Sequence, residues 1–179
     1  MGFFGLFGRR RHDRAGFGLY TAAVTAARDP FFYGRLGVPD TLDGRFDVVG
    51  LHAVLLIRRL RNLPPPGPAL AQAVFDAMFS DMDINLREMG VSDLAVGKRV
   101  RAMWEALHGR AQAYEAALAA ADAQALAAAL GRNVWRGAQS PPGSAEALAR
   151  HVLAAAALLD TQPLERLATG AALFPATGA

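Results

Sequence analysis

The stretch from Ala69 to Leu118 constrains the fold most, because it carries two long apolar stripes with helical spacing. Apolar side chains recur there every three or four residues, which places them on one face of an α-helix and indicates a half-buried helix. Gly90 separates the stripes. Glycine readily adopts the left-handed backbone conformation that commonly ends a helix. The sequence therefore predicts two long helices joined at Gly90. The stripe residues are Phe75, Met78, Phe79, Met82, Leu86 and Met89, followed by Val96, Val100, Met103, Trp104, Leu107, Ala111, Tyr114 and Leu118.

Charged side chains flank both stripes. Asp81 and Asp83 point about 200° apart on a helix, so they cannot easily share one metal ion within it. The second helix carries cations in its second turn, where positive charge opposes the helix dipole; they are Lys98, Arg99 and Arg101. Two interpretations stay open: these cations form ion pairs with the acidic first helix, or they meet an acidic or anionic partner.

The rest of the chain predicts further helices and no strand. Expected helices cover 15–28, 30–37, 42–62, 123–130 and 144–162, with caps at Thr41 or Asp43, at Asp122 and at Ser144, and a short turn is expected over 164–167. The helix over 42–62 is apolar nearly all round, which is typical of a central helix, and His52 within it is expected to be a hydrogen-bonded core residue. We predict an all-α, single-domain helical bundle of six to seven helices without a sheet. A flexible segment over 1–14, a helical domain over 15–170 and a tail over 171–179 are expected.

The beginning of the chain combines apolar and basic residues. Phe3, Phe4 and Phe7 precede Arg9–Arg11, a pattern that suits contact with lipid head groups at the inner membrane, although a disordered start is the alternative. We find no apolar run of about 18 residues and no secretory signal. The expected location is therefore the cytoplasm, with a peripheral position on the cytoplasmic face of the inner membrane as a further possibility.

The sequence shows no recognisable catalytic chemistry. There is no cysteine, the four histidines are scattered, and no nucleotide-binding, hydrolase or metal-ligand motif is present. The net charge of +3 is too small to argue for nucleic acid, and no DNA partner is expected. We therefore predict a non-enzymatic binding protein without a cofactor.

Two runs of the sequence are similar to a known family. Residues 75–114 (FDAMFSDMDINLREMGVSDLAVGKRVRAMWEALHGRAQAY) and 31–52 (FFYGRLGVPDTLDGRFDVVGLH) resemble the ubiquinol–cytochrome c chaperone family, and the likeness spans 31–118. The resemblance implies an assembly chaperone that binds newly made cytochrome b and promotes assembly of ubiquinol–cytochrome c reductase. It also implies a link to the ribosome exit region and, in mitochondrial members, a small partner protein.

The two long helices are the expected partner-binding region, since methionine packs well against irregular apolar partners. The candidate residues are Phe79, Met82, Asp83, Met89, Lys98, Arg99 and Arg101. One alternative is a lipid or quinone carrier, which predicts a closed tunnel lined by residues such as Val49, Phe79 and Trp104. Another is a ribosome- or RNA-docking module, which predicts one continuous patch of basic residues: Arg58, Arg59, Lys98, Arg99 and Arg101.

Overall fold

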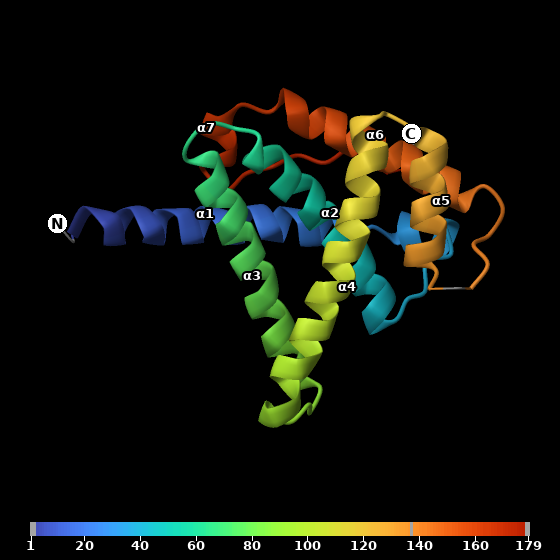
Figure 1. The fold of residues 1–179 in the computed structure, drawn as a ribbon, viewed down its shortest axis with the longest axis horizontal. Coiled ribbons are helices and arrows are strands. Elements are labelled where there is room, and N and C mark those ends of the chain that lie inside the picture. The colour runs from blue at the N-terminus through green and yellow to red at the C-terminus, as the bar shows by residue number, and fades with distance from the viewer. Residues whose placement is uncertain (1–2, 137, 178–179) are drawn as a thin grey trace.

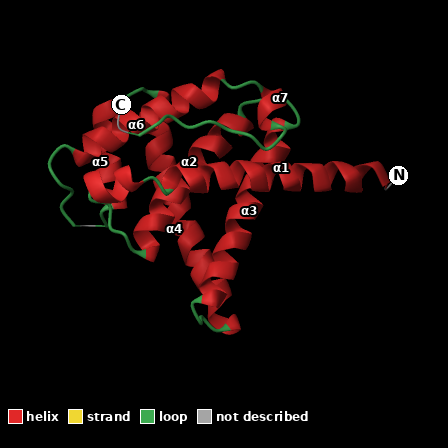
Figure 2. Cartoon of the chain, turned by 180° about the vertical axis from the view of Figure 1, so that it is seen from behind, coloured by secondary structure: helices red, strands yellow, loops and turns green. Residues whose placement is uncertain are grey.

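The computed structural model describes residues 3–136 and 138–177, and every regular element in these ranges is helical. The elements are α1 (Phe3–Ala27), η1 (Phe31–Arg35), α2 (Leu42–Arg61), α3 (Gly67–Glu88), α4 (Asp93–Ala119), α5 (Ala123–Val134), α6 (Ser144–Thr161) and α7 (Leu164–Leu167). Figures 1 and 2 show them from opposite sides, with no strand in the described part of the chain. The prediction of an all-α fold is confirmed.

The helix α2 lies at the centre of the molecule, as the sequence predicted. It contacts α1, α3, α4, α5 and α6. The hydroxyl of Thr41 caps its start by accepting a hydrogen bond from the Gly44 amide at 3.2 Å. Because α2 is surrounded, its leucines are buried on several faces, and the other helices are positioned by packing against it.

The helices α3 and α4 form a V that projects from the body, with the turn at Gly90 at its point (Figure 1). Gly90 has φ +81°, and its amide donates to the Arg87 carbonyl at 2.9 Å. The Val91 amide donates to the Leu86 carbonyl at 3.0 Å. These two bonds are the Schellman motif, which satisfies carbonyls at the end of α3 and confirms the predicted helix end.

The helix α1 begins earlier than the sequence predicted. We expected a flexible segment before Ala15, yet the chain is helical from Phe3. Extending a helix costs little once a packed turn exists, and residues after Ala15 pack tightly in the core. The glycines at positions 5 and 8, which have low helix propensity, are therefore tolerated within this extension.

Other boundaries differ by a few residues. Ser92 stands at the N-cap of α4 but its side chain makes no capping bond, and Ser144 is the first residue of α6, whose N-cap is Gly143. The α3 helix begins at Gly67 because Pro68 suits a first turn, where no amide donor is needed. Asp122 caps α5 as predicted, accepting bonds from the amides of Gln124 and Ala125.

The residues from 171 to 177, which we expected to form a tail, return along the body. The Leu173 amide donates to Gln162 Oε1 at 2.8 Å, and Gln162 Nε2 donates to the Leu173 carbonyl at 2.9 Å. Phe174 packs against the core, with its ring centroid 5.1 Å from that of His52. This segment therefore covers part of the core beside α2 and α6.

His52 is a hydrogen-bonded core residue, as predicted. Its Nδ1 donates to the Val48 carbonyl at 2.8 Å, because a carbonyl oxygen can only accept. Its Nε2 is then the acceptor at 3.3 Å from Nε2 of His151 on α6. Desolvation by burial lowers the pKa of His52 to about 4, so the ring is neutral at physiological pH.

A buried ion pair joins three helical segments. The Asp47 side chain on α2 is 2% exposed and accepts bonds from Arg136 Nε at 2.7 Å, Arg136 Nη2 at 3.0 Å and the Arg110 guanidinium. Arg110 lies on α4, and Arg136 follows α5. The carboxylate therefore links α4 and the end of α5 to α2.

Candidate binding surface

The inner side of the α3–α4 V carries an aromatic cluster. The rings of Phe75 and Phe79 are stacked with centroids 4.4 Å apart, and the Trp104 ring stands edge-on at 4.8 Å from Phe75 and 5.8 Å from Phe79. All three side chains are only half-buried. Aromatic side chains in such a position offer a large apolar contact area to a partner.

The point of the V exposes apolar side chains that proteins usually bury. Leu94, in the first turn of α4, is 98% exposed, and Ile84 and Met89 on the α3 side are each 52% exposed. Single exposed apolar residues are ordinary, but three of them on either side of one projecting turn favour a protein or membrane contact.

The basic residues of α4 remain available to a partner. Among the described residues, Lys98 and Arg99 are exposed and make no ion pair, whereas Arg101 Nε donates to Glu105 of its own helix at 3.1 Å. The interpretation that these three cations pair with the acidic helix α3 is therefore wrong. The α3–α4 ion pair among the described residues joins Arg87 to Asp93.

The predicted continuous basic patch is also wrong. Arg58 pairs with Glu115 near the end of α4 at 3.1 Å, and Arg59 lies 3.9 Å from Asp160 of α6, so both arginines have acidic partners. Glu115 follows Arg99 by about four helical turns, which corresponds to about 24 Å along the axis. The ribosome- or RNA-docking alternative therefore lacks the continuous basic patch that it requires.

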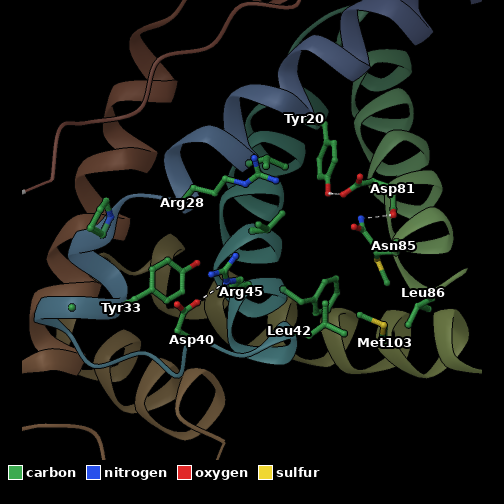
Figure 3. Close-up of a pocket in the computed structure, with 16 residues that line it drawn as sticks. Tyr20, Arg28, Tyr33, Asp40, Leu42, Arg45, Asp81, Asn85, Leu86 and Met103 are labelled. Atoms are coloured by element: carbon green, nitrogen blue, oxygen red, sulfur yellow. Dashed lines mark hydrogen bonds and ion pairs between the residues drawn. The ribbon is translucent and has the colours of Figure 1, made fainter. Parts of the chain in front are cut away.

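A pocket of about 820 Å³ lies where α1, η1, α2, α3 and α4 meet. Figure 3 shows Arg28, Tyr33 and Arg45 on one side of it and Tyr20, Asp81 and Asn85 on the other. The apolar lining comes mainly from Val24, Phe46, Val49, Met82, Leu86 and Met103. The pocket is open to solvent, so the closed tunnel predicted for a lipid carrier is wrong; Val49 lines the pocket, and Phe79 and Trp104 lie in the aromatic cluster.

The polar groups of the pocket are partly engaged with one another. The Tyr20 hydroxyl donates to Asp81 Oδ2 at 2.7 Å, and Arg45 Nε donates to Asp40 Oδ1 at 2.5 Å. Burial and the bond to Asp81 raise the pKa of Tyr20, which stays protonated. Among the described residues, Arg28 makes no ion pair, and its side chain is exposed.

The predicted partner-binding residues divide between these surfaces. Met82 lines the pocket, Phe79 belongs to the aromatic cluster, and Met89, Lys98, Arg99 and Arg101 lie along the exposed end of the V. Asp83 pairs with Arg87 of its own helix at 2.6 Å. The sequence did not reveal Arg28, Tyr33 or Arg45 as neighbours, because they come from three separate elements.

In the described part of the chain, no group of three or more His, Asp or Glu side chains is arranged to hold a metal ion. The described helices also include none that is long and apolar enough to cross a membrane. The predicted membrane contact through Phe3, Phe4, Phe7 and Arg9–Arg11 stays a prediction, because of these side chains the structure describes those of Arg10 and Arg11, which are exposed.

The fold, the exposed point of the V and the open pocket define a helical binding protein. The sequence profile of the ubiquinol-cytochrome C chaperone family matches residues 34–174. The chain therefore belongs to this family, as the resemblance in the sequence indicated.

Known relatives agree with this assignment. The chain is 26% identical over 143 residues to ubiquinol-cytochrome-c reductase complex assembly factor 1 of Xenopus laevis, covering 80% of this chain and 71% of the frog protein. It is 25% identical over 149 residues to the assembly factor 1 of Mus musculus, covering 83% of this chain and half (50%) of the mouse protein. The crystal structure of the Cbp3 homolog from Brucella abortus matches with a TM-score of 0.83 and 37% identity, over 97% of this chain and 96% of that one.

Proposed function

We propose that this protein is an assembly chaperone for ubiquinol–cytochrome c reductase, that its client is newly made cytochrome b, and that it acts by binding without catalysis. The observation that carries the proposal is the exposed apolar point of the α3–α4 V, in a chain of the chaperone family. The relatives named for assembly of this reductase support the same complex.

The geometry suits an apolar polypeptide client. Leu94, Met89 and Ile84 present apolar surface at a projecting end, and the Phe75–Phe79–Trp104 cluster offers a second apolar surface on the inner side of the V. Burying one such side chain against a client stabilises the complex by about 1.5–3 kcal/mol. Lys98 and Arg99 next to this surface favour a client segment with acidic residues beside its apolar ones.

Deleting the encoding gene tests the function. We expect assembled reductase to decrease while other respiratory complexes stay at their normal level. Unchanged reductase in the deletion strain would refute the proposal.

Complementation tests the surface. The double variant Met89→Ser and Leu94→Ser removes two exposed apolar side chains, so it should keep its melting temperature but recover less cytochrome b in a pull-down and restore less reductase. The control is Phe17→Ser, which removes a side chain that is 63% exposed on α1. Full complementation by the double variant would place client binding elsewhere on the molecule.

A further inference from the structure

We propose that the pocket between α1, η1, α2, α3 and α4 binds an amphiphile that has an anionic head group and an apolar chain. Its volume of about 820 Å³ lies within the range of about 300–1,000 Å³ that is common for small-molecule sites. This ligand site is separate from the apolar point of the V, and it does not depend on which protein is the client.

The head-group side of the pocket is cationic. Figure 3 shows the side chains of Arg28 and Arg45 extending into the pocket on the side of Tyr33. Burial raises the pKa of Tyr33, the charges of Arg45 and Arg28 lower it, and the charge of Asp40 adds to the rise. A carboxylate or phosphate between the two guanidinium groups would accept charge-assisted hydrogen bonds from both.

The apolar side chains of the pocket suit a ligand that has a chain as well as a head. Val24, Val49, Met82, Leu86 and Met103 line the same space. Apolar groups and two convergent cations in one pocket match a ligand whose two ends differ in polarity. A nucleotide or a simple anion would leave this apolar lining in contact with water.

Two carboxylates also line the pocket, and they limit where the anion can lie. Asp40 accepts from Arg45 and offsets part of its charge, while Asp81 is engaged by the Tyr20 hydroxyl across the pocket. Arg28 has no ion pair in the described structure, so it supplies the main attraction. The anionic group therefore lies at the Arg28–Tyr33 side, away from Asp81.

Calorimetric titration of the purified full-length protein tests this site. The probes are dodecanoate, dodecanol and dodecyltrimethylammonium, each below its micelle concentration, because they share one chain and differ in charge. We expect saturable binding of dodecanoate and affinity at least about tenfold weaker for the neutral and cationic probes. Lysophosphatidylglycerol, in a second arm, distinguishes a phospholipid head group from a free carboxylate.

Three variants locate the binding. Arg28→Gln should weaken dodecanoate binding by about tenfold, since it removes the uncommitted cation. Val49→Phe should fill part of the apolar space and weaken all probes alike. Arg61→Gln, an exposed arginine at the end of α2 outside the pocket, is the control and should bind normally.

Several results would overturn the proposal. The proposal is wrong if neither dodecanoate nor the lysophospholipid binds saturably. It is also wrong if the anionic, neutral and cationic probes bind with equal affinity. Unchanged binding by both Arg28→Gln and Val49→Phe would place any binding outside this pocket. If a peptide with a free carboxyl end binds and both anionic amphiphiles do not, the pocket is a peptide site and the proposal is wrong. None of these results depends on the reductase assembly assay, so the two proposals fail separately.

Discussion

Asp47 shows how one residue can connect distant parts of the chain. Its carboxylate is almost completely buried, and it is bound by Arg110 from α4 and by Arg136 after α5. A buried charge is tolerated only when its lone pairs are satisfied, and here several donors satisfy them. The pair thus positions α4 and α5 against α2.

Replacing Asp47 with Asn should therefore destabilise the fold strongly. Arg136 would keep its pair with Asp43 at 3.0 Å, but Arg110, whose side chain is only 16% exposed, would lose its anion and remain largely desolvated. Removing one partner of a buried pair costs about 3–5 kcal/mol. Urea unfolding measures the loss.

The matched control for this variant is Glu105→Gln. It removes the partner of Arg101 in a pair whose side chains are 80% and 64% exposed, so stability should change by about 0.5 kcal/mol or less. If the two variants lose the same unfolding free energy, the buried ion pair contributes no more to stability than the exposed one.

At the scale of elements, the line of contact between α1 and α3, the seam, depends on a glycine, which has no side chain. A Cβ atom added to Gly16 would lie 2.4 Å from the Ala73 Cβ and 2.6 Å from the Ala73 carbonyl carbon. The two helix backbones are closer there than any larger residue allows. This close approach sets how α1 lies across α3, and α1 supplies Tyr20 and Val24 to the pocket, with Arg28 directly after its end.

Gly16→Ala should destabilise the protein, because the helices must separate or shift to admit the methyl group. Overpacking of this kind costs about 1–3 kcal/mol. Gly109→Ala is the matched control: nothing lies within 4 Å of the added Cβ, and alanine stabilises a helix interior by about 0.5–1 kcal/mol. Thermal unfolding should therefore move in opposite directions for the two variants, and a shift in the same direction would count against the seam.

At the scale of the whole molecule, the neutral histidine pair couples stability to acidity. His52 lies among α2, α6 and the C-terminal segment, in contact with His151 and with the rings of Phe32 and Phe174. Burial lowers the pKa values of both histidines, and Asp29 partly opposes that shift for His151. Protonation therefore favours the unfolded chain, in which the histidines regain their ordinary pKa.

The protein should lose stability as the pH falls from about 6.5 to about 4, the window between the ordinary pKa of histidine and the value of about 4 for His52. In that window the unfolded state binds the extra proton, so the unfolding free energy falls by up to about 1.4 kcal/mol per pH unit for His52. His52→Leu should flatten this dependence in urea unfolding series. An unchanged slope in His52→Leu would exclude His52 as the cause.

Much of the helical structure was predictable because its signals are local. Thr41, Gly90 and Asp122 act within one or two turns of their own helix, and each does what its residue type indicated. The start of α1 was not predictable in this way, since it depends on a packed turn at Ala15 that stabilises the extension toward Phe3. The sequence also showed that acidic and basic residues flank the apolar stripes of the two long helices. It did not show which residues form ion pairs with them.

The sequence by itself determined the all-α class, the long helix pair and its turn, because helical periodicity and capping are properties of neighbouring residues. Only the tertiary structure decided that Asp47 meets Arg110 and Arg136, and that Arg28, Arg45 and Met103 line one pocket. These groups lie on different helices, and their meeting depends on how those helices cross. The crossing is set by packing such as the contact of Gly16 with Ala73, which no local pattern encodes.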